Sequence, residues 1–388
     1  MYFGWIKKKG SVLLLASIIS MAVSGCSTTK NAISPMSIKE VNAAPVKTEV
    51  AYKAETPKPE ASVKENELVP FKGKAEHIFF HPLIIYPEKA FDNDSLSTGY
   101  NDWFVTVKEF DKILESLYEK NFVLVNYTQI YEEAVENGKT VIRNRELMLP
   151  PGKKPLIISI DDLNYYEYMR EDGNAYKLVL DMDGKTAAYV KTPSGQELIS
   201  RENEIIPILD EFVEQHSDFS HDGAKGIIAL TGYEGVLGYR TNKLDSPDFE
   251  NEKKQAFFVI DHLKKTGWTF ACHGWGHLDA ERISTQRLIR DTKRWKSEVE
   301  SLIGTTDIYI FPFGSTPPEK GESFKFLKEE GFKIFCSVGP VTNTIRYNDY
   351  AISDRRAVDG LSMHGNRKGL LDLFDSNEVL DSVRPSKF

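Results

Sequence analysis

The sequence has 388 residues, of which 41% are hydrophobic and 27% are charged, so most of it is expected to fold around an apolar core. The formal net charge of −8 argues against nucleic acid or anionic lipid as the main binding partner. The length fits one large domain or two smaller ones.

The first 25 residues are typical of a secretory signal. Three lysines, Lys7 to Lys9, precede an uncharged run, SVLLLASIISMAVSG, that is too short for a confident membrane span. The run ends in Val23-Ser24-Gly25-Cys26, which resembles the lipobox of bacterial lipoproteins. That resemblance implies cleavage before Cys26, lipidation of this cysteine and an extracytoplasmic protein anchored to a bacterial membrane. The alternative is an uncleaved anchor helix, which also places the bulk of the chain outside the cytoplasm.

Residues 26–70 are predicted to be the lipidated cysteine and a disordered linker, because they are rich in Lys, Glu, Pro, Ala, Ser and Thr. The mature chain would carry a net charge of −11, since residues 1–25 contain three lysines and no acid.

The two other cysteines, Cys272 and Cys336, lie in apolar, strand-like runs. We expect buried thiols, with a disulfide between them as the alternative.

The folded domain is expected over residues 71–388. Strands are predicted at 77–86 and 122–127, on either side of a helix at 107–120 whose apolar residues share one face. A short apolar run at 154–160 predicts a buried strand that ends in Asp161-Asp162. Residues 174–200 contain Asp-Gly and Ser-Gly turns between β-prone runs and predict an inserted β-hairpin.

Strands and helices alternate through the rest of the chain. Helices are predicted at 202–215, 251–267, 284–302 and 321–331, and strands at 226–235, 268–273, 307–314 and 332–338. This alternation is typical of βα units with a mostly parallel sheet, and six or seven such units close more readily as a barrel than as an open sheet.

Reactive residues stand where several of these strands end. His273 and His277 lie four residues apart in ACHGWGHLD, with Gly274 and Gly276 between them. On a straight strand they would be about 13 Å apart, but glycines allow the backbone to turn sharply and bring the rings together. Two imidazoles and one carboxylate form a common three-ligand site for a divalent metal. An H-x-x-x-H pair alone is more often structural, but the Asp161-Asp162 pair at another strand end favours a metal site.

Three motifs then point to a family. SIDDLNYY, HGWGH and FPFG resemble, in order and strand placement, the first three motifs of the polysaccharide deacetylase family, the NodB-type carbohydrate esterases. The resemblance spans residues 155–365 and implies a distorted (β/α)7 barrel and metal-dependent removal of N-acetyl groups from an N-acetylglucosamine-containing envelope polysaccharide, such as peptidoglycan or an exopolysaccharide. A polysaccharide and, through the lipid anchor, a membrane are the implied partners; no protein partner can be inferred.

The resemblance also implies residue roles. Asp162, His273 and His277 would hold the metal, most plausibly Zn²⁺, and Asp161 would be the general base. His364, in LSMHG, would be the general acid. A backbone N–H near Phe313, within Pro312-Phe313-Gly314, would stabilise the oxyanion. Trp275 and Tyr165 are candidates for contact with sugar rings, with packing under the loop as the alternative for Trp275. His81 would face the same mouth of the barrel or serve a core or loop role.

The chain departs from the family pattern at several positions. Leu163 replaces the motif-one glycine, Gly274 replaces a hydroxyl residue, and Ile310 stands where motif three has an arginine. Arg355 or Arg356 is expected to supply the missing charge from another strand. Two other functions stay open. One is a glycan-binding lipoprotein without activity on the same fold. The other is an amidohydrolase of a small non-sugar amide, in which the hairpin insertion would close the groove to polymers and leave a narrow pocket.

Overall fold

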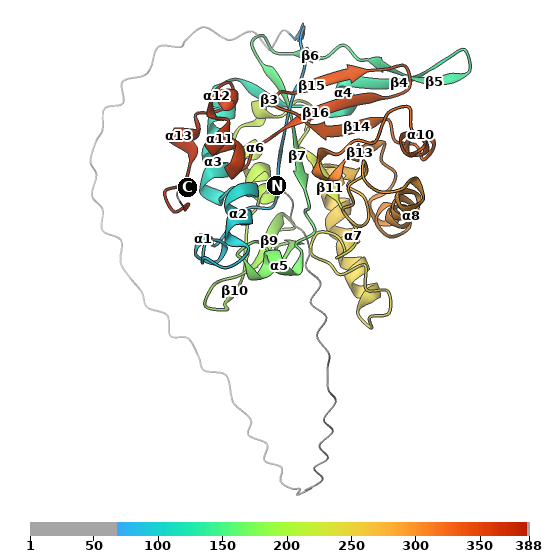
Figure 1. Cartoon of the computed structure of the whole chain (residues 1–388). Coiled ribbons are helices and arrows are strands. Elements are labelled where there is room, and N and C mark those ends of the chain that lie inside the picture. The colour runs from blue at the N-terminus through green and yellow to red at the C-terminus, as the bar shows by residue number, and fades with distance from the viewer. Residues whose placement is uncertain (1–67, 386–388) are drawn as a thin grey trace, which may run out of the picture. The chain divides into compact units, whose positions relative to one another are not determined.

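Seven parallel strands close into a barrel in the computed structural model, which describes residues 68–385 (Figure 1). Their order around the barrel is β2-β7-β11-β12-β13-β14-β16, and β16 pairs with β2 to complete the circle. The strands are β2 (Glu76–Phe80), β7 (Lys154–Asp161), β11 (Ile227–Leu230), β12 (Thr269–Cys272), β13 (Ile308–Ile310), β14 (Ile334–Val338) and β16 (Ala351–Ala357). The predicted seven-stranded barrel is therefore confirmed. The predicted signal sequence, Cys26 and the predicted linker up to residue 67 lie outside the described residues.

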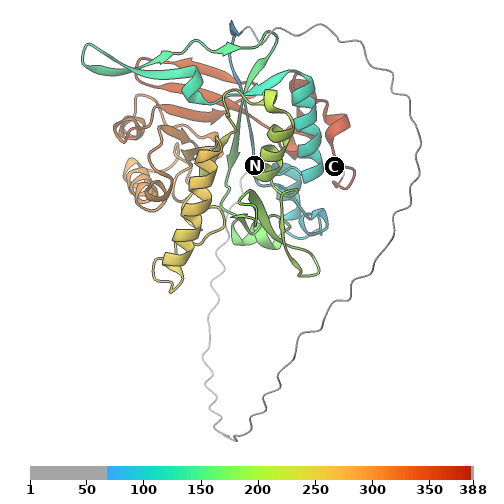
Figure 2. The ribbon, with the colours of Figure 1, turned by 180° about the vertical axis from the view of Figure 1, so that it is seen from behind.

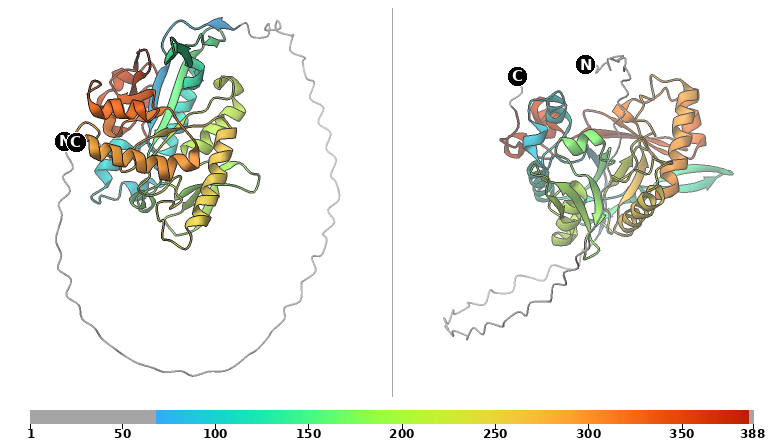
Figure 3. Two further views of the ribbon diagram at one scale, coloured as in Figure 1. Left: turned by 90° about the vertical axis from the view of Figure 1, so that its right-hand side faces the viewer. Right: turned by 90° about the horizontal axis from the view of Figure 1, so that it is seen from below.

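Helices surround the barrel, and the views from behind and from the side show α3, α6, α7 and α8 along its wall (Figures 2 and 3). The longer helices are α3 (Val107–Glu119), α6 (Ile205–Gln215), α7 (Phe249–Lys265), α8 (Thr285–Trp295) and α10 (Glu322–Glu329). A π-helical turn, Lys296–Glu300, joins α8 to α9 (Ser301–Ile303). Shorter helices are α1 (Pro87–Ala90), α2 (Ser97–Trp103), α4 (Tyr127–Ile130), α5 (Glu167–Glu171), α11 (Gly360–Gly365), α12 (Arg367–Leu370) and α13 (Ser376–Val379).

The helix α3 shows why these segments form where the sequence predicts. Its apolar residues Phe110, Ile113, Leu114 and Leu117 are buried on one face, at the spacing of a helix. A capping box between Thr106 and Glu109 satisfies the free N–H groups of its first turn. Among residues 68–385, no helix combines the length and the apolar character that a membrane crossing requires.

Several predicted strands are shorter than expected. The strand predicted at 77–86 ends at Phe80, because Pro82 has no N–H to donate to a sheet. The strand predicted at 122–127 stops at Leu124 as β3 (Phe122–Leu124), which pairs with the start of β7. After it, the chain turns into α4.

Small antiparallel sheets decorate the barrel. The insertion predicted as a hairpin is a three-stranded sheet of β8 (Lys177–Leu180), β9 (Thr186–Lys191) and β10 (Glu197–Ser200). A further hairpin, which was not predicted from the sequence, projects from the barrel (Figure 1). It consists of β4 (Tyr131–Glu136) and β5 (Lys139–Asn144). Its Asn137-Gly138 turn has φ values of 50° and 75°, as a two-residue hairpin turn requires. β1 (Val69–Pro70) pairs with β6 (Met148–Leu149), and β15 (Asn343–Arg346) pairs with β16.

The two cysteines occupy opposite faces of the barrel sheet. Cys336 packs with the apolar side chains that fill the barrel, whereas Cys272 packs in the layer between sheet and helices. Both are buried, and neither forms a disulfide. The prediction of two buried thiols is therefore confirmed, and the disulfide alternative is wrong.

Candidate active site

The Asp-His-His cluster forms at the carboxyl ends of neighbouring strands. Asp162 follows β7, and His273 and His277 follow β12. Asp162 Oδ1 lies 4.0 Å from His273 Nε2, and Asp162 Oδ2 lies 3.6 Å from His277 Nε2. One ligand atom from each residue lies within 4.8 Å of the others. The three residues predicted as metal ligands therefore meet at one point.

A sharp turn of the backbone places the two histidines side by side. Gly274 has a φ of 69°, in the left-handed region that favours glycine, whereas Gly276 does not need this conformation. The buried carboxylate of Asp291, on α8, accepts hydrogen bonds from the N–H groups of Trp275 (2.7 Å) and Gly276 (2.8 Å). As a result, the centroids of the two imidazole rings are 5.0 Å apart. The turn and the shared cluster thus occur together.

Neighbouring groups prepare the ligands for a metal. His273 Nδ1 donates to the carbonyl of Ile310 at 2.8 Å, which leaves Nε2 as the coordinating atom. The hydroxyl of Tyr166 donates to Asp162 Oδ1 at 2.6 Å and also contacts Thr231 Oγ1 at 2.6 Å. Such outer hydrogen bonds hold ligands in place at metal sites.

The electrostatics of the cluster match its donor atoms. Burial lowers the pKa of His277 to about 4, although the Asp162 carboxylate acts in the opposite direction. Burial alone would raise the pKa of Asp162, but the neighbouring His277 and His273 favour its ionised form, outweigh burial and lower that pKa. A neutral imidazole and an ionised carboxylate are the forms that bind a divalent cation. The donor set therefore fits a zinc-type ion.

Three residues at this cluster have strained backbone. Asp162, His277 and Phe313 have φ values of 59°, 49° and 60°, a region that residues other than glycine seldom adopt. Each such residue costs on the order of 1–3 kcal/mol and persists only where the surrounding structure enforces it. Three of them at one mouth of the barrel indicate a functional site.

Asp161 is held by an arginine from a strand on the other side of β2. Arg355, on β16, donates to both carboxylate oxygens of Asp161 at 2.8 and 2.9 Å, and both residues are buried. Burial alone would raise the pKa of Asp161, but the charges of Arg355 and His273 outweigh it and hold this pKa well below its usual value. Asp161 is therefore a carboxylate, and of the two arginines considered for this pairing it is Arg355 that contacts it.

Arg356, the other arginine considered for this pairing, lies elsewhere. Successive residues of a strand point to opposite faces of the sheet. Arg356 therefore points out of the barrel, where its guanidinium binds both carboxylate oxygens of Asp372 at 2.8 Å and lies 3.2 Å from Glu76.

His81 lies at the same mouth as the cluster. It directly follows β2, and its Nδ1 donates to the carbonyl of Trp103 at 3.1 Å, which turns Nε2 away from that contact. His81 also lowers the pKa values of Asp161, Asp162 and His277, although burial and other neighbouring groups have larger effects on each of them.

His364, expected to be the acid, is partly buried on α11, which packs against α2.

Two residues expected to contact sugar are engaged in packing. Trp275 Nε1 donates to Glu298 at 2.7 Å, and the guanidinium of Arg294 covers one ring face at 3.4 Å. Tyr165 is fully buried in the main core, where its hydroxyl faces Glu204. Because both side chains are occupied by the protein, their predicted role in substrate contact is corrected to a structural one.

Other aromatic rings are exposed around the cluster. Phe313, in the turn Pro312–Gly314 after β13, is 67% exposed and lies against His277 with ring centroids 4.5 Å apart. Trp103, whose carbonyl holds His81, is 47% exposed, and Tyr168, which stacks on Tyr166, is 41% exposed. Ring contact between Tyr100 and Tyr168 shows that α2 and α5, side by side in Figure 1, are neighbours. We call Trp103, Tyr168 and Phe313 the aromatic rim.

Comparisons with known proteins find similar structures but no similar sequences. No family model and no curated protein matches the chain. A deacetylase of Streptococcus pyogenes, PplD, solved with acetate, has 13% identity and a TM-score of 0.44, over 79% of this chain and 99% of that one. A de-N-acetylase of Aggregatibacter actinomycetemcomitans has 11% identity and a TM-score of 0.41, over 74% and 95%. BA0330 of Bacillus anthracis, named as a polysaccharide deacetylase, has 11% identity and a TM-score of 0.39, over 74% and 65%. At such identities the likeness concerns the fold.

Proposed function

We propose that this protein is a metal-dependent hydrolase that removes N-acetyl groups from an N-acetylglucosamine-containing envelope polysaccharide, peptidoglycan or an exopolysaccharide. The observation that carries the proposal is the Asp162–His273–His277 cluster beside the buried Asp161–Arg355 pair. This arrangement unites a metal-binding set with a separate carboxylate that is free of the metal. Both are needed to hydrolyse an amide by this route.

The ligands would be the carboxylate of Asp162 and the Nε2 atoms of His273 and His277, with zinc as the ion that best suits two imidazoles and a carboxylate. When bound, such an ion lowers the pKa of water and polarises the acyl carbonyl. Tyr166 and the Ile310 carbonyl would keep the ligands oriented.

Asp161 is the proposed base. Arg355 uses one lone-pair position on each of its oxygens, and a carboxylate has further positions with which to accept a proton from the attacking water. The bond from water oxygen to the acyl carbon forms, and the C–N bond then breaks to release acetate. A backbone N–H near Phe313 is the proposed donor to the oxyanion.

Beside His364, the acid predicted from the sequence, His81 is proposed as a second candidate for the acid. Its Nδ1 is occupied by the Trp103 carbonyl, so Nε2 is the atom that carries the proton to the departing amine nitrogen. Phe80 pairs with Ile160 across β2 and β7, so His81 and Asp161 follow adjacent positions at the ends of these two strands, which supports this role.

The aromatic rim supports a saccharide as the substrate. Trp103 on α2, Tyr168 on α5 and Phe313 in the turn after β13 come from three separate segments, and each residue is at least 41% exposed beside a polar cluster. Flat rings with one side in water suit ligands that have an apolar face and polar edges, as sugar rings have. The alternative of a small amide required a narrow, closed pocket, and exposed rim residues favour the polymer instead.

The alternative of a glycan-binding protein without activity rested on the missing motif-three arginine. Arg355 supplies a buried guanidinium at Asp161, so that absence no longer favours an inactive protein.

The proposal is tested by metal content and acetate release together. The full chain, purified in detergent and loaded with zinc, is offered chitooligosaccharides and peptidoglycan. We expect one zinc per chain and acetate release, with Asp161→Asn keeping the zinc and losing the release. Zinc without acetate from either substrate would contradict the deacetylase, and a chain without zinc or another divalent ion would contradict the metal site.

We also propose an extracytoplasmic location with a membrane anchor at lipidated Cys26. The support is the order of lysines, apolar run and Val23-Ser24-Gly25-Cys26 in the sequence. Labelling of growing bacteria with an alkyne fatty acid should mark the wild-type chain and not Cys26→Ala. Equal labelling of both would contradict the anchor.

A further inference from the structure

A chain of buried polar groups runs through the barrel behind Asp161. Arg355 Nη1 donates to Ser159 Oγ at 2.9 Å in addition to its bond with Asp161. Ser159 Oγ lies 3.0 Å from His77 Nε2, and His77 Nδ1 lies 2.9 Å from the hydroxyl of Tyr127. These residues are buried, so water does not compete for their hydrogen bonds.

The direction of each hydrogen bond in the chain follows from the donors available. A guanidinium only donates, so Ser159 Oγ accepts from Arg355. Among the described contacts of Ser159, His77 Nε2 is then the acceptor left for the serine proton. His77 therefore carries its proton on Nδ1 and donates it to Tyr127, whose hydroxyl lies 3.6 Å from Cys336 Sγ. Burial, and next the charge of Arg355, lower the pKa of His77, in agreement with a neutral ring.

We propose that His77 and Ser159 are positioning residues, which fix the guanidinium of Arg355 and through it the carboxylate of Asp161; this rests on the proposed role of Asp161 as the base. One N–H of Arg355 Nη1 is directed to Asp161 and the other to Ser159. Loss of the Ser159 contact would leave a buried N–H without a partner and allow the guanidinium to rotate.

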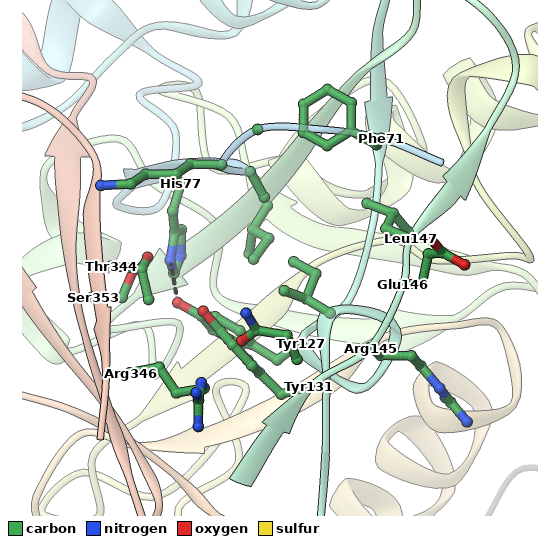
Figure 4. Close-up of a pocket in the computed structure, with 16 residues that line it drawn as sticks. Phe71, His77, Tyr127, Tyr131, Arg145, Glu146, Leu147, Thr344, Arg346 and Ser353 are labelled. Atoms are coloured by element: carbon green, nitrogen blue, oxygen red, sulfur yellow. Dashed lines mark hydrogen bonds between the residues drawn. The ribbon is translucent and has the colours of Figure 1, made fainter. Parts of the chain in front are cut away.

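The far end of this chain reaches the opposite mouth of the barrel. His77 and Tyr127 line a cavity of about 350 Å³, together with Tyr131, Thr344 and Ser353 (Figure 4). The dashed line in Figure 4 is the His77–Tyr127 bond. Ser323, on α10, is also buried, but its hydroxyl is 2.9 Å from Thr285 and contacts no member of this chain. It therefore offers a matched control for loss of a buried serine hydroxyl.

Kinetics of four variants test the proposal. We expect Ser159→Ala and His77→Leu to lower kcat on the order of 10-fold or more, as loss of outer supporting contacts commonly does, with KM within about two-fold of wild type. His77→Gln should retain most of kcat, because its amide oxygen can accept from Ser159. Ser323→Ala should match the wild type. Wild-type kcat in Ser159→Ala, equal losses in Ser323→Ala, or His77→Gln as poor as His77→Leu would each overturn the proposal.

A measurement without substrate separates this proposal from the deacetylase itself. In NMR spectra of the full chain with ¹⁵N-labelled histidine, we expect His77, assigned by its loss in His77→Gln, as the neutral ring protonated on Nδ1. Ser159→Ala should shift its Nε2 resonance, and Ser323→Ala should not. A charged ring or a proton on Nε2 would overturn the chain of hydrogen bonds. If the wild type releases no acetate while these signals appear as expected, the proposed reaction fails and the hydrogen-bond chain stands.

Discussion

Arg355 on β16 and Asp161 on β7 are joined by two hydrogen bonds of 2.8 and 2.9 Å across the barrel interior, although β2 separates their strands in the sheet. Such a bidentate pair fixes both distance and orientation. The positive charge beside Asp161 therefore comes from β16, and not from position 310 on β13, where the chain has an isoleucine. The pair is the basis of the first prediction.

Removal of Arg355 should destabilise the protein. In Arg355→Ala the ionised Asp161 is left buried without its partner, at a cost of about 3–5 kcal/mol in the free energy of unfolding. Arg355→Lys should recover part of this stability but little activity, since an ammonium cannot bind both oxygens in the same way. Urea denaturation measures the first effect and acetate release the second. Arg356→Ala is the control, because its partner Asp372 is largely exposed, and a larger loss there than in Arg355→Ala would contradict the assignment.

Removal of the Tyr166 hydroxyl should weaken metal binding without abolishing it. Tyr166→Phe takes away the 2.6 Å bond to Asp162 but leaves the three ligands, so we expect zinc affinity to fall by about 10–100-fold at unchanged stoichiometry. Competition with a chelator measures the affinity. Tyr165→Phe, which removes the hydroxyl facing Glu204, should bind zinc as the wild type does. Similar losses of zinc affinity in both variants would mean that loss of either hydroxyl perturbs the fold, and that the contact with Asp162 has no specific effect.

Stability should fall as the pH rises towards neutrality because of Glu204. Its carboxyl group is fully buried, and burial raises its pKa from 4.5 to about 7, despite hydrogen bonds from the N–H groups of Ile205 and Leu83. Between these two pH values the folded protein holds a proton that the unfolded chain has released, so stability present below pH 4.5 is lost as the pH rises through 7.

Glu204→Gln removes this titration. Above pH 7 we expect the variant to be more stable than the wild type by about 3 kcal/mol, and near pH 4 to be similar to it. Thermal and urea unfolding across this range measure the difference. Glu202→Gln, at an exposed neighbouring position, should leave the pH profile unchanged. A wild-type profile in Glu204→Gln would show that another group is responsible.

The aromatic rim should affect long substrates more than short ones. Trp103→Ala and Phe313→Ala each remove a stacking surface of roughly 1–1.5 kcal/mol, so we expect KM for chitooligosaccharides to rise by about 10-fold. The kcat and KM for a small N-acetylated sugar should change little. Phe257→Ala, at a position on α7 that is also exposed, is the control and should leave both substrates unaffected. Equal effects on long and short substrates would argue against a polymer groove.

Much of the barrel and its metal cluster could be predicted from sequence because their signals are local. One short apolar run is followed by Asp161-Asp162, and another is followed by His273. Each run predicts both a buried strand and the residue at its end. Parallel strands direct their carboxyl ends to one mouth, so these residues had to meet. The left-handed turn at Gly274 likewise follows from the residue type.

The support around the cluster depends on tertiary contacts that no local pattern reports. Tyr165 and Tyr166 are adjacent, yet one enters the core and the other binds Asp162, because the backbone at Tyr165 has a φ of 51°. Trp275 lies between the two ligand histidines but packs against Arg294, on a helix almost twenty residues away in sequence. Which of Arg355 and Arg356 points into the barrel depends on the orientation of β16. The sequence pattern did not predict this strand, so it could not decide between the two arginines.

Cys272 and Cys336 have a practical consequence for how the protein matures. Burial raises the pKa of both thiols, that of Cys336 to about 11, so neither carries the thiolate that oxidants and alkylating agents attack. The barrel therefore reaches its native state without an oxidising partner or a disulfide isomerase. Its assembly should proceed equally well under reducing and oxidising conditions, and the redox conditions around the folded protein should not affect its lifetime.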